Sequence, residues 1–83
     1  MERNEIMSVL QETILQVIDK AEDSQIIESA SLIDDFGADS LQVVEVVSRT
    51  MRRLKIRVRR TELSKPKNIG ELVDLFEAAQ QSA

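Results

Sequence analysis

The sequence from Asp34 to Val47, DDFGADSLQVVEVV, contains the start of a helix and, at that start, a single serine. Asp39 directly precedes an apolar helical pattern, and Gln42 follows three residues later. This spacing predicts a capping box, in which Asp39 is the N-cap and each side chain binds the backbone N–H of the other residue. Ser40 then occupies the first helical position, where unpaired N–H groups and the positive end of the helix dipole favour an attached anion such as a phosphate.

The surroundings of Ser40 favour a serine that is modified over a serine that acts as a nucleophile. The chain contains no His and no Cys, so a catalytic triad has no base to activate the hydroxyl. The sequence also lacks a Gly-rich phosphate loop and a metal-ligand pattern, so an intrinsic enzyme is the least favoured class. Gly37 and Ala38 predict a flexible, unbulky approach through which another protein's active site reaches the hydroxyl. An ordinary helix cap with an exposed serine is the alternative.

At these residues the sequence resembles the attachment motif of acyl carrier proteins, in which the serine of Asp-Ser-Leu carries 4′-phosphopantetheine. Five consecutive residues match the Gly-Ala-Asp-Ser-Leu form that is common in fatty-acid-type carriers, namely Gly37, Ala38, Asp39, Ser40 and Leu41. The resemblance extends over most of the chain, from Ile6 to Phe76. It implies that a phosphopantetheinyl transferase esterifies Ser40 with coenzyme A. Acyltransferases, ketosynthases and other partner enzymes would then load and process acyl groups held as thioesters on the arm.

The resemblance also implies roles for residues around the helix that begins at Ser40. Asp39 would position the helix end and the metal ion that the transferase brings. The positions that face partner enzymes in the family, together with the basic residue near the end of the helix, are Leu41, Val44, Glu45, Ser48 and Arg52. Such a carrier is expected to be a monomer that binds no nucleic acid and does not insert into a membrane.

The composition predicts one small aliphatic domain. The chain has 83 residues, and we expect residues 1–83 to form a single carrier domain. Apolar residues make up 42% of the chain but aromatic residues only 2%, so the core must consist mainly of Leu, Ile and Val. The absence of Cys suits a reducing compartment. No apolar run is long enough to span a membrane and no signal-peptide pattern is visible, so we expect a cytoplasmic protein.

The apolar periodicity predicts an all-α fold, a small antiparallel bundle of three main helices plus one short helix, with a long first loop. The first helix is predicted from about Asn4 to Asp19, and the second from Ser40 to about Leu54. A second capping box, NIGE at residues 68–71, opens the last helix. The short helical turn is predicted over Thr61–Lys65, with Thr61 as its N-cap and Leu63 buried.

Two connections join the predicted helices. The long first connection, residues 20–39, is mostly irregular and needs apolar anchors, for which Leu32, Ile33 and Phe36 are the candidates. Residues 52–60, RRLKIRVRR, alternate apolar and basic side chains like a strand, but no partner strand is visible. We therefore expect this segment to contain the end of the second helix and then a loop in which Ile56 and Val58 point inward.

The second helix carries two apolar stripes where a core needs only one. The first stripe is formed by Val43, Val46, Val47, Thr50 and Leu54. The second stripe is formed by Leu41, Val44, Ser48 and Met51. It indicates either wider burial or an exposed strip that meets partner enzymes and covers the acyl chain.

The charges are separated along the chain. Residues 1–48 carry a net charge of −9, residues 49–67 carry +8 and residues 68–83 carry −3. Such asymmetry normally shapes association. The second helix of a typical fatty-acid carrier is acidic, whereas here Gln42, Met51 and Arg52 occupy positions where acids are common and only Glu45 retains the charge. This difference indicates a dedicated carrier of a specialised lipid or polyketide pathway, whose partners present acidic or mixed surfaces; the alternative is a solvated basic face.

Two other functions remain open from the sequence. Seven bases within Arg49–Arg60 are typical of a small helical module that binds nucleic acid or another anionic surface. A pI near 4.8, the lack of stacking aromatic residues and the lack of a helix-turn-helix pattern count against this function. The other possibility is a carrier relative that has become a helical partner subunit, and the intact Asp39-Ser40-Leu41 motif counts against it.

Overall fold

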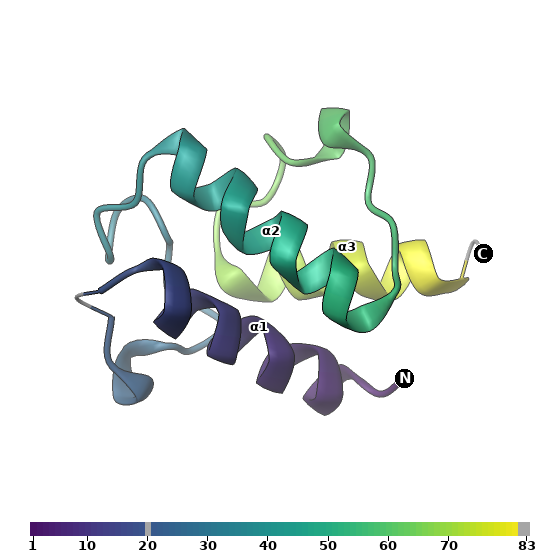
Figure 1. Cartoon of the computed structure of the whole chain (residues 1–83), viewed down its shortest axis with the longest axis horizontal. Coiled ribbons are helices and arrows are strands. Elements are labelled where there is room, and N and C mark those ends of the chain that lie inside the picture. Colours follow the sequence, from purple (N-terminus) through teal and green to yellow (C-terminus); the bar gives the residue numbers. More distant parts are fainter. Residues whose placement is uncertain (20, 82–83) are drawn as a thin grey trace.

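The computed structural model describes residues 1–19 and 21–81, which form three α-helices, two short 3-10 helices and no strand (Figure 1). The α-helices are α1 (Arg3–Val17), α2 (Ser40–Leu54) and α3 (Ile69–Gln81), and the 3-10 helices are η1 (Asp23–Gln25) and η2 (Arg60–Glu62). The predicted all-α class with three main helices is therefore confirmed. Among the described residues, no helix is long and apolar enough to cross a membrane.

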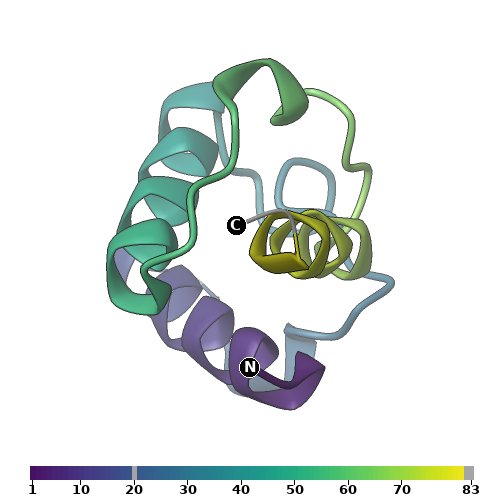
Figure 2. The ribbon, with the colours of Figure 1, turned by 90° about the vertical axis from the view of Figure 1, so that its right-hand side faces the viewer.

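The three helices surround a common core (Figure 2). α1 runs in the opposite direction to α2 and α3 and packs against both of them (Figure 1). Because α2 and α3 run in the same general direction, the chain must return along the molecule between them. Residues 55–68 make this return, with η2 on the way, and they bring the beginning of α3 to the same end of the molecule as the beginning of α2 (Figure 1).

The core is aliphatic, as the composition predicts, with Phe76 as its one fully buried ring among the described residues. Its other fully buried side chains come from all three helices and include Ile6, Leu10, Ile14, Val46, Val47, Ile69 and Val73. Two threonines, Thr13 and Thr50, are fully buried with them, and each donates its hydroxyl hydrogen to a carbonyl of its own helix at 2.8 Å. No buried side-chain polar atom in the described part of the chain lacks a partner, so polar groups do not weaken the core.

The predicted boundaries are correct for α2 and for the start of α3, whereas those of α1 differ by one or two residues. At α3, Asn68 accepts the N–H of Glu71 at 2.8 Å, but the Glu71 side chain accepts the N–H of Lys67 and not that of Asn68, so the prediction of a complete second capping box is wrong. α1 begins at Arg3 and ends at Val17, because Ile18 already adopts an extended conformation. α2 spans Ser40–Leu54 as predicted, and Lys55 ends it in the left-handed conformation with φ of 57°. The prediction of Thr61 as an N-cap is wrong, because η2 begins one residue earlier. Leu63 is only half-buried, although it packs against the core.

The apolar residues that anchor the first connection differ from the predicted ones. The predicted connection begins at Lys20, which lies outside the described part of the chain. Leu32 is buried and Phe36 is half-buried against the core, but Ile33 is 59% exposed, so its prediction as an anchor is wrong. The buried residues that replace it are Ile26 and Ala30. The chain turns sharply over residues 31–37, and this turn directs the side chain of residue 33 away from the core.

Backbone hydrogen bonds also attach this connection to the start of α3. The N–H of Ile69 donates to the carbonyl of Ala30, and the N–H of Gly70 donates to the carbonyl of Glu28, both at 2.8 Å. The first N–H groups of a helix have no acceptor within the helix, so the connection satisfies two of them. A side chain at position 70 would approach Glu28 to within 3.0–3.2 Å, which explains why glycine occupies this close contact.

The segment after α2 packs as predicted. Ile56 and Val58 are buried, while the basic residues that alternate with them are exposed. Met51 holds the segment in place, since its carbonyl accepts the N–H of Ile56 and its sulfur accepts the N–H of Val58, both at 3.2 Å.

Candidate functional site

Ser40 is the first residue of α2, and its side chain is exposed. The predicted capping box is present. An Asp39 carboxylate oxygen accepts the N–H of Gln42 at 2.8 Å, and the Gln42 side-chain oxygen accepts the N–H of Asp39 at 3.2 Å. These reciprocal bonds fix the first turn of the helix, so the Ser40 hydroxyl is presented from a rigid element.

The chain approaches Ser40 through a tight turn. Gly37 has φ of +67°, a left-handed conformation that glycine adopts without strain. The N–H of Gly37 donates to Ile33 at 3.2 Å and that of Ala38 donates to Leu32 at 2.9 Å. The prediction that Ala38 belongs to an open, flexible approach is wrong, because its side chain is buried in the core. The approach is exposed at Gly37 and Ser40 but is held by an apolar anchor between them.

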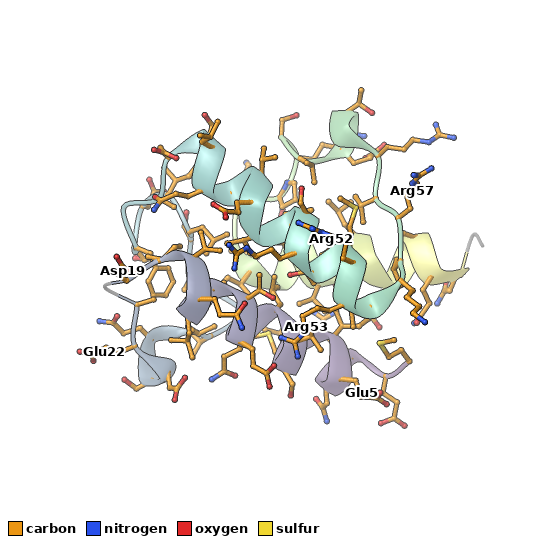
Figure 3. All side chains as sticks on the ribbon, viewed as in Figure 1. Glu5, Asp19, Glu22, Arg52, Arg53 and Arg57 are labelled. Atoms are coloured by element: carbon orange, nitrogen blue, oxygen red, sulfur yellow. The ribbon has the colours of Figure 1, made fainter. Side chains whose placement is uncertain are left out.

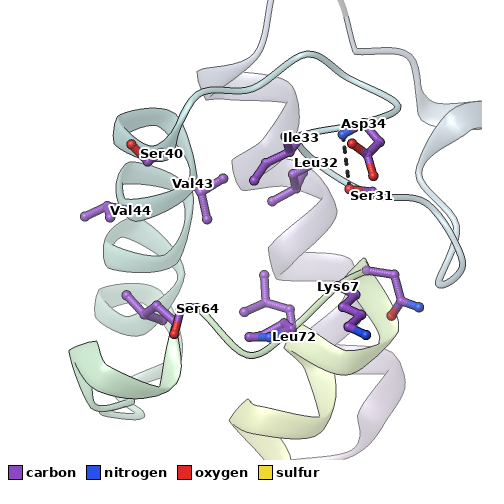
Figure 4. Close-up of a pocket in the computed structure, with 13 residues that line it drawn as sticks. Ser31, Leu32, Ile33, Asp34, Ser40, Val43, Val44, Ser64, Lys67 and Leu72 are labelled. Carbon is purple, nitrogen blue, oxygen red and sulfur yellow. Dashed lines mark hydrogen bonds between the residues drawn. The ribbon is translucent and has the colours of Figure 1, made fainter.

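A cavity of about 630 Å³, here called the Ser40 cavity, opens beside the start of α2 and has Ser40 among its lining residues (Figure 4). Three segments contribute its walls: α2, the first connection, and the return segment with the start of α3. The apolar residues that line it include Val43, Val44, Leu32, Ile33, Leu63 and Leu72. Val43 points from α2 toward Leu32 and Ile33 in Figure 4. This cavity is therefore suited to an apolar chain that enters from the direction of Ser40.

The helix start also suits an anionic group on Ser40. The capping box uses the N–H of Gln42, whereas the N–H groups of Ser40 and Leu41 have no protein acceptor within the described residues. A phosphate attached to the Ser40 oxygen would lie near these donors and near the positive end of the helix dipole. No group of three or more metal-ligating side chains gathers in the part of the chain that the structure describes.

The predicted partner-facing residues lie together on the outer side of α2. Leu41 is 79% exposed, Glu45 and Arg52 are exposed, and Val44 and Ser48 are half-buried. At 100° per residue these five positions share one face of the helix, opposite the buried Val46, Thr50 and Leu54. The second apolar stripe is thus not simply a wider core. The structure brings the five residues together, and their contact with partner enzymes stays a prediction.

The basic segment divides into paired and unpaired side chains. Arg49 binds Glu45 at 2.8 Å and Arg53 binds Glu12 at 2.5 Å. Arg52, Lys55 and Arg57 are exposed and have no ion pair among the described residues. Arg52 and Arg57 lie beside α2 and the segment after it, whereas Glu5, Asp19 and Glu22 lie along α1 and the connection that follows (Figure 3).

Sequence reasoning identified the helix start but not the cavity beside it. The hydroxyl, its cap and the outer stripe all belong to one continuous segment with local signals. The opposite walls come from Leu63 and Leu72, which lie far from Ser40 in the sequence, and from Ile33 in the turn before α2. No local pattern marks these residues as cavity walls, and only the return of residues 55–68 along the molecule places Leu63 and Leu72 there.

Comparisons with known proteins agree with this geometry. The family model of the phosphopantetheine attachment site matches residues 8–76. An acyl carrier protein of Thermotoga maritima is 35% identical over 75 residues, which are 90% of this chain and 91% of the relative. The polyketide biosynthesis acyl-carrier-protein AcpK of Bacillus subtilis is 32% identical over 83 residues, which are 100% of both chains.

A solved structure supports the fold assignment. The acyl carrier protein from Enterococcus faecalis superimposes with a TM-score of 0.77 at 24% sequence identity, covering 95% of this chain and 99% of that chain. The family model matches most of the chain, including the capped start of α2, and it is defined by the predicted prosthetic group, 4′-phosphopantetheine. The chain therefore belongs to the acyl carrier protein family, whose members carry acyl groups on a phosphopantetheine arm.

Proposed function

We propose that Ser40 is the attachment residue for 4′-phosphopantetheine in this acyl carrier. The observation that carries the proposal is an exposed hydroxyl at the first position of a capped helix, within the residues that the family model matches. The helix-start N–H groups of Ser40 and Leu41 suit the phosphate of the arm. Asp39 contributes by holding the helix start, and its exposed carboxylate is placed to help position the metal ion of the transferase.

Each part of the site has a distinct role in the proposed mechanism. The transferase would join the Ser40 oxygen to the phosphopantetheinyl phosphate of coenzyme A as a phosphodiester. The pyrophosphate bond of coenzyme A breaks, adenosine 3′,5′-bisphosphate leaves, and the hydroxyl proton passes to a base of the transferase or to water. When bound, the arm supplies a terminal thiol that holds acyl groups as thioesters. The Ser40 cavity shelters an apolar acyl chain from water between processing steps. The chain itself carries the intermediate, and acyltransferases and ketosynthases supply the catalysis.

The partner enzymes dock on the outer face of α2, through Leu41, Val44, Glu45, Ser48 and Arg52. The exposure of Leu41 beside Ser40 supports this role, since a large apolar side chain in water favours burial in an interface. We assign residues 1–83 to one carrier domain that acts as a monomer in the cytoplasm.

The pathway that fits best is a specialised one of the polyketide type. The full-length similarity to a carrier named for polyketide biosynthesis supports this assignment, and so does the basic end of α2. The similarity to acyl carriers also favours this function over the nucleic-acid-binding module that the basic segment suggests.

The test is the intact mass of the protein after incubation with coenzyme A and a broad-specificity phosphopantetheinyl transferase. The wild-type chain is expected to gain one phosphopantetheinyl group, and Ser40→Ala none. Ser8→Ala, which removes an exposed hydroxyl from α1, is the matched control and is expected to gain one group. Circular dichroism should show the same helix content in all three proteins. Modification of Ser40→Ala, or an unmodified wild-type chain, would contradict the proposal.

A further inference from the structure

A second cleft, of about 430 Å³, lies where α2 ends, and we call it the α2-end cleft. Its lining consists of two apolar residues, one serine and three bases, namely Met51, Ile56, Ser48, Arg52, Lys55 and Arg57. The left-handed conformation of Lys55 turns the chain back along the helix. The hydrogen bonds from Ile56 and Val58 to Met51 then hold the two walls together. The cleft is thus a preformed feature of the fold.

No acidic side chain among the described residues pairs with the three bases of the cleft, so the positive charge of the cleft is uncompensated. Arg52, Lys55 and Arg57 are exposed and make no ion pair, although Arg49 and Arg53 close by are paired with acids. The helix dipole stabilises bases in the last turn of a helix, which explains why Arg52 lies there without an ion-pair partner. It does not account for Arg57, which lies beyond the helix. An apolar floor inside a cationic rim is complementary to an apolar side chain that carboxylates flank.

The position of the cleft relative to Ser40 suits one continuous interface. Arg52 lies on the same outer face of α2 as Leu41 and Ser48. Twelve residues separate Ser40 from Arg52, which corresponds to about 18 Å along a helix. This length lies within one ordinary protein–protein interface, so an enzyme that receives the arm at Ser40 also reaches the cleft.

We propose that the α2-end cleft docks the partner enzymes of this carrier through an apolar side chain flanked by acidic residues. The proposal rests on the carrier function proposed above and adds the chemistry of the partner surface. Arg52 and Arg57 bind the carboxylates, while Met51 and Ile56 receive the apolar side chain. Docking at this end of α2 orients the partner so that its active site faces Ser40.

The experiment uses the isotope-labelled full chain, before and after incubation with the transferase, and two unlabelled peptides, one with leucine flanked by glutamates and one with lysines in place of the glutamates. Isotope-edited NMR titration is expected to show that the acidic peptide shifts the amides of Ser48, Met51 and Ile56, and that the basic peptide does not. Arg57→Glu should weaken the binding of the acidic peptide about tenfold, equivalent to about 1.4 kcal/mol. Arg59→Glu makes the same charge change on an exposed residue outside the cleft, and it should have a much smaller effect.

A charge swap makes the test specific. The double variant Arg52→Glu, Arg57→Glu is expected to bind the basic peptide and to lose the acidic one. The melting temperature should fall only slightly, through the acid that Arg52→Glu places at the negative end of the helix dipole, since neither side chain has an ion pair in the described structure. Equal losses in Arg57→Glu and Arg59→Glu, no binding of the acidic peptide, or its displacement by a short single-stranded DNA at physiological salt would each overturn the proposal.

The peptide-binding test and the intact-mass test can fail independently of each other. If the mass test shows arm attachment but the peptides do not bind, the carrier function stands and the docking proposal is wrong. If the acidic peptide binds at the cleft but Ser40 is not modified, the carrier function fails although the cleft binds its ligand.

Discussion

Asp39 determines the local geometry of the proposed attachment site. Its carboxylate satisfies the N–H of Gln42, and the return bond from Gln42 to Asp39 closes the box that holds Ser40 at the helix start. The residue is exposed, so its contribution to folding comes from the cap rather than from burial. This separation between capping and burial allows a direct test.

Asp39→Ala is expected to lower the free energy of unfolding by about 1 kcal/mol, because the first turn of α2 loses its N-cap acceptor. Asp39→Asn keeps a side-chain oxygen and should cost only a few tenths of that. Urea unfolding followed by far-UV circular dichroism measures both. If the two variants are equally destabilised, the charge rather than the hydrogen bond provides the stability.

Gly70 is constrained by a distant segment, whereas Asp39 acts within its own helix. An added Cβ would lie 3.0 Å from the Glu28 carboxylate and 3.2 Å from the Glu28 carbonyl oxygen. Alanine normally stabilises a helix by about 1 kcal/mol relative to glycine. Here Gly70→Ala should instead destabilise the protein by about 1–2 kcal/mol, because the overpacked contact involves backbone that a hydrogen bond already fixes. A higher melting temperature than that of the wild type would show that the connection yields easily.

At the scale of the element, α2 has two faces with different energetic roles. Leu54 and Leu41 are the same residue type in the same helix, but Leu54 is 5% exposed and Leu41 is 79% exposed. Leu54→Ala is expected to cost about 2–4 kcal/mol through the cavity it leaves. Leu41→Ala should change the unfolding free energy by less than about 0.5 kcal/mol. Chemical denaturation gives both values, and a large stability loss in Leu41→Ala would contradict its assignment to the partner face.

The same helix shows how far the sequence could predict the structure. Its first residue follows from Asp39 and Gln42, and its last from the end of the apolar stripe at Leu54, so both boundaries are correct. The first connection has no periodicity, and its anchors depend on where α3 lies. For this reason the prediction of Ile33 as a buried anchor is wrong, and no sequence pattern marks the buried Ile26. The Ser40 cavity could not be predicted either, because its walls meet only in the folded chain.

At the scale of the whole molecule, one side chain joins the chain's N-terminal helix to two distant segments. Arg3 binds Glu28 at 2.5 Å, Asp74 at 2.6 Å and also Glu77. The hydrogen bond to Glu28, followed by those to the other two carboxylates, raises the pKa of the Arg3 guanidinium above its usual value. A raised pKa of a base stabilises the folded state wherever the group is protonated. This contribution is therefore complete at neutral pH and is lost only in strong alkali.

Arg3→Gln is expected to lower the melting temperature, because three carboxylates then face one another without a cation. High salt shortens the Debye length to about 3 Å at 1 M and screens their repulsion. The difference from wild type should therefore shrink between low and high salt, as measured by calorimetry. Arg57→Gln, which removes one charge but breaks no ion pair, is the control and should show a much smaller dependence on salt. If the difference in melting temperature between wild type and Arg3→Gln is the same at low and high salt, the loss of stability comes from packing and not from charge.

The two backbone bonds from the start of α3 to the first connection have a kinetic consequence. The amide hydrogens of Ile69 and Gly70 are bonded to carbonyls of a segment that continues into a wall of the Ser40 cavity. These amides become available to solvent deuterium only when the connection lifts from α3. Their exchange rates therefore measure how often this wall of the Ser40 cavity opens, and exchange should slow when a long acyl chain occupies the cavity.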